Sequence, residues 1–191
     1  MKLFLSASVS ILASLSLTSA CVVEDELADD ELADDDFGET SQELAAYARS
    51  IENVHTRKCF DIPWGSTSSG APVNQFTCHG GPAQQFVVEA TPGVPGFVRV
   101  RNTNSNLCVT PTGYQGWSTP SMRLVQVTCG STSNWTLENR ADLSGGYRTT
   151  FRWAYDSAYC IDVPGGSSQD GLQLQAFPCH GGNNQRFDVR P

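Results

Sequence analysis

The stretch CIDVPGGSSQDGLQLQAFPCHGGNNQRF, residues 160–187, has a close counterpart in CFDIPWGSTSSGAPVNQFTCHGGPAQQF, residues 59–86. A third, more divergent copy, CVTPTGYQGWSTPSMRLVQVTCGSTSNW, occupies residues 108–135. The first cysteines of the three copies therefore lie about fifty residues apart. A sequence that repeats at such a period indicates a fold built from three similar units.

The chain around these copies has the texture of a β protein. Short runs alternate apolar and polar residues, as in Phe-Val-Arg-Val-Arg at residues 97–101, and Asn, Gly, Pro and Ser interrupt them. No segment of helical period exceeds a turn or two. We therefore predict an all-β fold, with an apolar strand before the first cysteine of each copy, at residues 51–54, 97–100 and 147–153.

Four features recur in the same order in each copy: the repeat length, a pair of cysteines, a Cys-x-Asp-Val element or its relic, and a Gln-x-aromatic ending or its relic. Together they resemble the ricin B-chain type β-trefoil, a family that includes bacterial xylan- and galactose-binding modules. The resemblance covers residues 46–191 and implies repeats at about 46–90, 91–140 and 141–191. Three such units close a six-stranded barrel capped by hairpins, because one unit alone cannot bury its apolar face.

Six of the seven cysteines belong to this region and fall into three similar pairs. We interpret them as disulfides, since no pair has metal-binding Cys-x-x-Cys spacing and the histidines do not cluster with them. Each bridge would close a loop of about twenty residues and contribute about 3 kcal/mol. No metal or other cofactor is expected. The predicted bridges join Cys59 to Cys78, Cys108 to Cys129 and Cys160 to Cys179.

Residues 1–20 have the features of a secretory signal peptide: Met1-Lys2, an apolar run and small residues before Cys21. Cys21 is the cysteine without a partner and resembles the acylated cysteine of a bacterial lipobox, although Thr18 stands where that motif usually has Leu. We expect an exported lipoprotein of the cell envelope, held at the membrane through lipid on Cys21. Simple secretion is the alternative.

Residues 21–45 form an expected acidic, disordered tether. Eleven acidic residues and no basic residue occur between positions 21 and 44, and their mutual repulsion opposes a compact state. Residues 45–191 have eleven Lys and Arg against nine Asp and Glu. That near-neutral balance does not indicate a basic surface of the kind that binds nucleic acid. We expect a monomer.

The third repeat carries the full set of groups expected of a sugar site. Binding a neutral sugar requires a carboxylate or carboxamide for adjacent hydroxyls and an aromatic face for the ring. The resemblance implies that an Asp grips two hydroxyls, an aromatic residue stacks, an Asn adds a bond and the Gln of the ending also braces the Asp loop. The matching residues are Asp162, Gln175, Phe177, Asn184 and Gln185.

The first repeat keeps most of this set, as Asp61, Asn74, Phe76 and Gln84, but it has Ala83 in place of the Asn. We therefore expect it to be the weaker site. Three further residues are candidates for the pocket edges: Trp64, which could lie against the ring or cap its hairpin, and His79 and His180, for which ordinary loop roles are the alternative.

The second repeat has lost the set. Thr110 replaces the Asp, Val125 and Val127 replace the carboxamide and the aromatic residue, and Ser133 replaces the Gln. Any one of these residues could serve the fold alone, since an Asp beside a turn often bonds its own backbone. The Asp, the carboxamide and the aromatic residue are kept together in two copies and lost together in the third, which favours a role in binding over a role in the fold alone.

The predicted function is therefore that of a carbohydrate-binding lectin, with a glycan or polysaccharide of galactoside or xylan type as partner. The alternative is a protein-binding β-trefoil, such as a protease inhibitor or a toxin attachment subunit, because fold alone does not decide function. No enzyme is predicted, since the chain lacks the common nucleophile, metalloprotease and phosphate-loop motifs.

Overall fold

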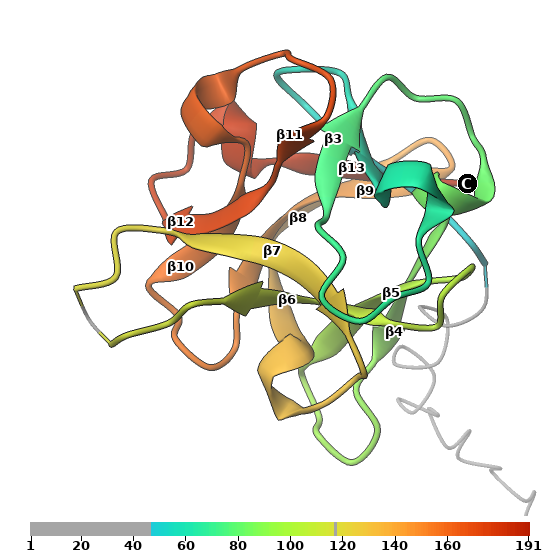
Figure 1. The fold of residues 1–191 in the computed structure, drawn as a ribbon. Helices are drawn as coiled ribbons and strands as arrows, with labels where there is room; N and C mark the ends of the chain where they lie inside the picture. Colours follow the sequence, from blue (N-terminus) through green and yellow to red (C-terminus); the bar gives the residue numbers. More distant parts are fainter. Residues whose placement is uncertain (1–46, 117) are drawn as a thin grey trace, which may run out of the picture. The chain divides into compact units, whose positions relative to one another are not determined.

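The computed structural model describes residues 47–116 and 118–191, which form one all-β domain (Figure 1). The predicted signal peptide, the acidic tether and Cys21 lie outside these residues. Within them, no helix is long and apolar enough to cross a membrane.

Each repeat contributes four strands at equivalent places, which confirms the predicted β-trefoil. Strands predicted at residues 51–54, 97–100 and 147–153 are found as β1, β5 and β9, with shifts of one or two residues at some ends. The first repeat has β1 (Ser50–Asn53), β2 (Cys59–Asp61), β3 (Asn74–Phe76) and β4 (Phe86–Ala90); the second has β5 (Val98–Asn102), β6 (Cys108–Thr112), β7 (Met122–Val127) and β8 (Asn134–Leu143); the third has β9 (Gly146–Trp153), β10 (Tyr159–Asp162), β12 (Gln175–Pro178) and β13 (Phe187–Arg190), with the short β11 (Leu172–Gln173) before β12.

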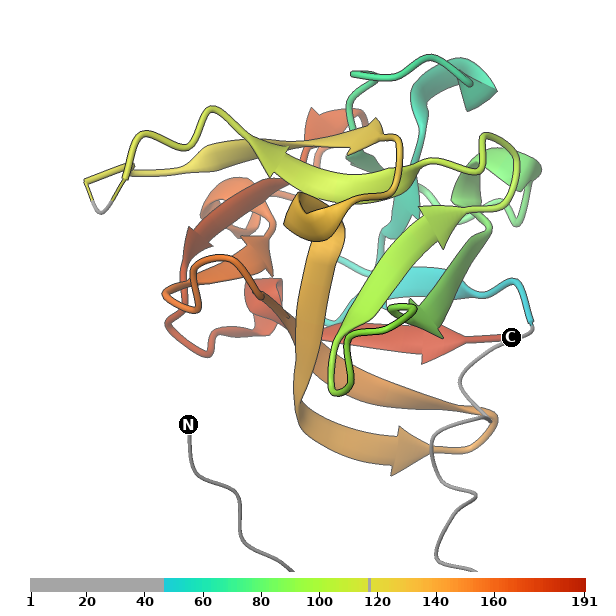
Figure 2. The ribbon, with the colours of Figure 1, turned by 90° about the horizontal axis from the view of Figure 1, so that it is seen from below.

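Antiparallel pairs join the repeats to one another. β4 pairs with β5, β8 with β9, and β13 with β1, where Ile51 lies opposite Val189. The β8–β9 hairpin, drawn in amber, runs along the lower edge of the domain in Figure 2. The last pairing joins the first repeat to the third, so all three repeats contribute to one core.

Large apolar side chains from the three repeats meet in that core. The rings of Phe60 and Phe187 have centroids 5.2 Å apart, and Phe60 also packs edge-on against Phe86 at 5.9 Å. Phe151 lies 6.1 Å from Phe187. All four residues are almost fully buried. The three disulfides pair within repeats, as predicted.

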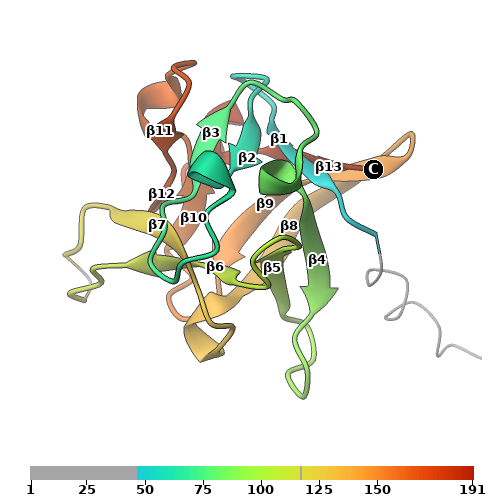
Figure 3. The same cartoon turned by 45° about the vertical axis from the view of Figure 1, so that its right-hand side comes forward.

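Five short 3-10 turns shape the loops around the hairpins: η1 (Pro63–Gly65), η2 (Pro82–Gln84), η3 (Ser131–Ser133), η4 (Pro164–Gly166) and η5 (Asn183–Gln185). η1 and η2 lie side by side, in teal and green in Figure 3, and η4 packs against η5 in the same way. These paired turns frame the predicted sites of the first and third repeats.

One asparagine fastens each of these turn pairs to a neighbouring repeat: Asn102 of the second repeat and Asn53 of the first. The Asn102 amide donates to the carbonyl oxygens of Pro82, Ala83 and Gln85 at 3.1–3.4 Å. Asn53 donates in the same way to three carbonyl oxygens around η5, at 3.1–3.4 Å. Both asparagines are buried, so we name them the latch residues.

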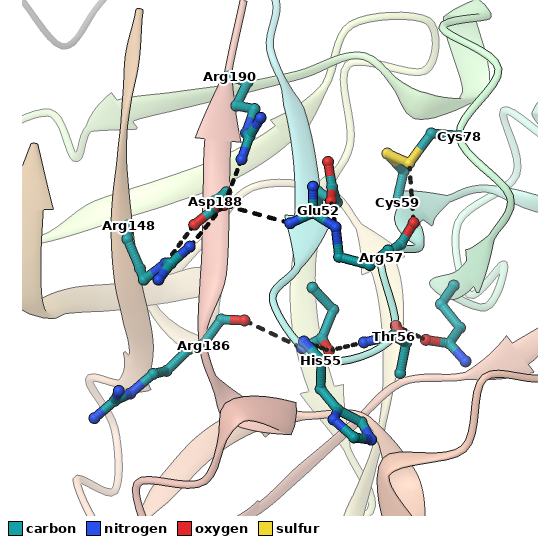
Figure 4. A network of polar contacts seen from close by, with 12 residues as sticks. Glu52, His55, Thr56, Arg57, Cys59, Cys78, Arg148, Arg186, Asp188 and Arg190 are labelled. Atoms are coloured by element: carbon teal, nitrogen blue, oxygen red, sulfur yellow. Dashed lines mark hydrogen bonds and ion pairs between the residues drawn. A yellow bond between two sulfur atoms is a disulfide. The ribbon is translucent and has the colours of Figure 1, made fainter. Parts of the chain in front are cut away.

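A buried carboxylate ties β13 to its neighbours. Asp188 accepts hydrogen bonds from Arg148 at 2.6 and 3.1 Å and from Arg190 at 2.7 Å, and Figure 4 shows it between the two guanidinium groups. Arg57 adds a longer contact of 3.9 Å. Burial raises the pKa of Asp188, but these hydrogen bonds and charges outweigh it and leave that pKa below its ordinary value.

Candidate carbohydrate-binding site

Strand register brings the predicted site residues together in pairs. In the first repeat Asp61 lies opposite Asn74 across β2 and β3, and Cys59 lies opposite Phe76. In the third repeat Asp162 lies opposite Gln175 across β10 and β12, and Cys160 lies opposite Phe177. Directly opposed residues of an antiparallel pair are neighbours on one face. The spacing read from the sequence therefore becomes a cluster in each hairpin.

In the third repeat the Asp162 carboxylate is held by three side chains. Gln175 donates to Oδ1 and Asn184 donates to Oδ2, each at 2.8 Å, and His180 Nε2 lies 3.4 Å from Oδ2. Phe177 packs edge-on against His180 with ring centroids 6.1 Å apart. Three of the predicted residues thus converge on Asp162, and most acceptor positions of its carboxylate are already used.

Burial raises the pKa of Asp162, and the hydrogen bonds from its neighbours only partly offset that rise. Asp162 itself is 1% exposed. A carboxylate that is hard to reach and whose charge is disfavoured by burial is a poor partner for an incoming hydroxyl.

The first repeat places the equivalent groups in an open pocket. Asp61 contacts His79, whose Nε2 lies 3.4 Å from Oδ1. The carbonyl oxygen of Asn74 is buried and has no hydrogen-bond partner among the described residues. Phe76 is 39% exposed. Among the described residues no amide donor occupies the Asp61 carboxylate as Gln175 and Asn184 occupy Asp162, and the buried Asn74 oxygen is unfavourable until something bonds to it.

The pocket around these groups has a volume of about 720 Å³, within the range of small-molecule sites. Its floor carries Asp61, and η1 and η2 form walls. We call it the first-repeat pocket, and its lining residues that matter here are Asp61, Trp64, Asn74, Phe76, His79, Ala83 and Asn104.

Trp64 lines this pocket with an exposed side chain and a left-handed backbone. Its side chain is fully exposed, with an exposed fraction of 102%. Its backbone is left-handed, with φ 59° and ψ 16°, a conformation that costs a residue with a side chain about 1 kcal/mol or more. At the equivalent place in η4 the chain has Gly165, with φ 59° and ψ 10°. The first repeat thus keeps a large aromatic residue where glycine would be unstrained.

Gln84 and Gln185, expected both to line the sugar sites and to brace the Asp loops, lie in the interior. Both are fully buried. The Oε1 of Gln84 accepts from the N–H groups of His79 and Gly80, and its amide donates to the carbonyl of Thr77. Gln185 makes the same set of bonds in the third repeat. All three bonds are internal, so these side chains brace the Cys-His-Gly-Gly turns and face no ligand.

The second repeat has no carboxylate at this place. Thr110 lies opposite Val125 across β6 and β7, and its hydroxyl donates to the carbonyl of Thr132 at 2.7 Å. Trp153 occupies the latch position and donates from its ring nitrogen to the same carbonyl at 2.8 Å. These bonds satisfy the backbone of η3.

Two residues of the sites were not predicted from the sequence. Asn104 lines the first-repeat pocket, and His55 lines a groove in the third repeat. Each belongs to a repeat next to the one whose site it lines, and each lies two residues after a latch asparagine. Alignment of the turns Asn-Val-His-Thr at 53–56 and Asn-Thr-Asn-Ser at 102–105 is the signal that pairs them.

Comparison with known proteins agrees with the fold. The family model described as a ricin-type β-trefoil lectin domain-like matches residues 40–127. No curated protein sequence matches the chain. The designed three-fold symmetric protein ThreeFoil is similar with a TM-score of 0.64 and 23% identity, over 75% of this chain and 98% of that one.

Two natural proteins have this fold, one over nearly its whole chain and the other over a small part of a larger enzyme. The ricin B-like lectin of Macrolepiota procera, solved with lactose, has a TM-score of 0.58 and 20% identity, over 75% of this chain and 95% of the lectin. An exo-β-1,3-galactanase of Clostridium thermocellum has a TM-score of 0.65 and 22% identity, over 76% of this chain but only 30% of the galactanase. At these identities the likeness concerns the fold.

Proposed function

We propose that this β-trefoil domain, which matches a ricin-type lectin-like family model over residues 40–127, binds carbohydrate, with the first-repeat pocket as its principal site. The third repeat supplies a second, weaker site around Asp162. The observation that carries the proposal is Trp64, which is strained and fully exposed beside a buried carboxylate. The activity is binding without chemistry.

The groups in the first-repeat pocket suit a pyranose ring. Asp61 offers two carboxylate oxygens as acceptors for adjacent hydroxyls, and Asn74 lines the pocket beside it. Bonds to an ionised acceptor are stronger than bonds between neutral groups. Trp64 and Phe76 offer aromatic faces to the apolar side of a sugar. The lactose-bound fungal lectin and the galactanase support a galactoside-type ligand, and xylan-type chains remain in the set to be tested.

The ranking of the two sites reverses the expectation from residue content. The third repeat has the fuller set of side chains, but Gln175 and Asn184 already use the Asp162 carboxylate. It also has Gly165 where the first repeat has Trp64. We therefore assign the larger share of binding to the first repeat, because among the described residues no amide donor occupies its carboxylate and its stacking face is exposed.

Each site alone is expected to bind a single sugar at about millimolar to sub-millimolar affinity, because few hydrogen bonds and a stacked ring offset little more than the cost of association. Two sites on one polysaccharide chain raise the effective concentration that each one meets. Retention on a polymer is therefore expected to exceed single-sugar binding by a large factor.

Replacing Trp64 with glycine is the direct test of this proposal. Trp64→Gly is expected to weaken binding of lactose or xylotriose about tenfold, since the stacking face is lost. The free energy of unfolding should change by less than about 1 kcal/mol, because relief of the left-handed backbone offsets the added freedom of the unfolded chain. Titration calorimetry and thermal melting measure the two effects.

Two further variants sharpen this experiment. Tyr47→Ala removes another exposed aromatic residue, outside the pocket, and should leave binding unchanged. Gly165→Trp has open space for its first side-chain atom and should strengthen the third-repeat site at some cost in stability. Equal affinity of Trp64→Gly and the parent would remove the basis of the proposal.

We also propose display at the cell envelope, on the basis of the signal-like residues 1–20 and Cys21. Mass spectrometry of the native protein is expected to find a chain that begins at a lipid-modified Cys21. A start at another residue, or an unmodified Cys21, would reduce this part of the proposal to simple secretion.

A further inference from the structure

We propose that each sugar site continues across the boundary between repeats into a second subsite, whose outer wall is supplied by a neighbouring repeat. Asn104 forms that wall for the first repeat, and His55 forms it for the third. The inference rests on the proposed function and narrows it: the preferred ligand has at least two linked sugar units, and positions 104 and 55 select the second unit.

The cavities of the two repeats show the extension at the same place. The first-repeat pocket runs from Asp61 past Trp64 to Asn104. In the third repeat a groove of about 390 Å³ lies between η4, η5 and His55, and we call it the third-repeat groove. Gly165 stands there at the position of Trp64, and His55 stands at the position of Asn104. Two independent copies thus form a concave surface at the same junction.

Asn104 is fixed in the orientation that this role requires. The latch residue Asn102 holds the turn, since its Oδ1 accepts from the N–H of Asn104 at 3.1 Å. The Asn104 amide in turn donates to the carbonyl of Gly65 at 2.9 Å. One N–H and the carbonyl oxygen of the amide remain for a ligand. An anchored carboxamide at a pocket edge is a preorganised partner for a sugar hydroxyl.

His55 has an equivalent position in the third-repeat groove. The Oδ1 of the latch residue Asn53 accepts from its N–H at 3.0 Å. A side-chain atom built on Gly166 would lie 3.3 Å from Cδ2 and 3.5 Å from Nε2 of His55. The imidazole therefore lies against the bare backbone of η4, and Figure 4 shows it pointing away from the Asp188 cluster. It offers the groove a ring face and ring nitrogens.

The residue at position 184 in the third repeat, and its counterpart at position 83 in the first, explain why the cavities of the two repeats differ. In the third repeat the Asn184 amide donates to Asp162 and to the carbonyl of Val163, and Asn184 also lines the groove. It stands between the carboxylate and the groove. The first repeat has Ala83 at that place, so its two parts join in one larger pocket. Loss of the Asn side chain thus opens a path for a longer ligand.

The test compares ligands of different length at one site at a time. In the Asp162→Thr background, Asn104→Ala is expected to weaken lactose and xylotriose about fivefold, the effect of one hydrogen bond, and to leave galactose and xylose within about twofold. In the Asp61→Thr background, His55→Ala should show the same pattern. Titration calorimetry with these four sugars on the full chain gives each ratio.

Asn106→Gly is the matched control for Asn104→Ala. Asn106 belongs to the same turn, has a left-handed backbone at φ 58° and lies outside the pocket, so glycine is tolerated and affinity should not change. Equal weakening of short and long ligands by Asn104→Ala, or no weakening, would overturn the inference while the proposed function stands. A parent chain that binds none of the four sugars would overturn both.

Discussion

A chain in which Asp61 and Asp162 are both replaced by threonine is expected to fold and to lose polysaccharide binding. Threonine is the matched substitution, because Thr110 occupies the same position in the second repeat and is accommodated there with a bond to a backbone carbonyl. Each change removes the carboxylate that would bond sugar hydroxyls. The loss of both sites also removes the gain from two-point attachment, so retention on a polymer should fall by about a hundredfold or more.

The single changes divide the effect between the repeats. Asp61→Thr should remove most of the binding of lactose or xylotriose, because among the described residues the Asp61 carboxylate has only His79 as a partner. Asp162→Thr should remove less, because its carboxylate is already bonded by Gln175 and Asn184. Affinity electrophoresis in gels containing galactan or xylan measures the polymer, and calorimetry measures the short ligands.

Asp142→Asn provides the control for charge. Asp142 is exposed, pairs with Arg140 at 3.5 Å and lies outside the first-repeat pocket. It should bind as the parent does. A double threonine variant that melts like the parent and is still retained by the polysaccharide would place the sugar-binding surface outside the two repeat sites.

Replacing Asp188 with asparagine is expected to give the largest loss of stability, about 2–4 kcal/mol. Asp188 is fully buried and is bonded by Arg148 and Arg190, and removal of one partner from such a group leaves buried charges uncompensated. The arginines are partly exposed, so water recovers part of the loss. Denaturant unfolding measures the difference.

The same carboxylate gives a pH dependence with a defined sign. The pKa of Asp188 is lowered in the folded chain from an ordinary value of 3.8. Its contribution to stability is therefore complete above that value and is lost as the pH falls through the lower, folded-state pKa. The parent should lose stability in this acid range more steeply than Asp188→Asn. Identical acid profiles, or an unchanged free energy of unfolding at neutral pH, would contradict this role.

The repeats made the fold and the disulfides predictable. Copies one and three have the same cysteine spacing, so Asp61 meets Asn74 and Asp162 meets Gln175 at the same register. The differences between the repeats were also informative. The second repeat has Thr110 in place of the acid, and there Thr110 and Trp153 both donate to the backbone carbonyl of Thr132.

What the sequence did not reveal depends on burial and on contacts between repeats. A sequence does not distinguish a buried glutamine from an exposed one, and only the structure shows that the three hydrogen bonds of Gln84 are internal. The strain of Trp64 follows from a backbone angle. Asn104 reaches the first-repeat pocket from the next repeat, and a motif defined within one repeat does not include it.

The central claim is that this chain binds carbohydrate through its repeat pockets, and a glycan array probed with the full chain and with the Asp61→Thr, Asp162→Thr variant tests it most directly. The parent is predicted to bind a defined set of glycans with at least two linked sugar units, galactosides or xylo-oligosaccharides among them, and the variant to bind none of that set. A parent that binds no glycan, or a folded variant that binds the same set as strongly, would contradict the claim.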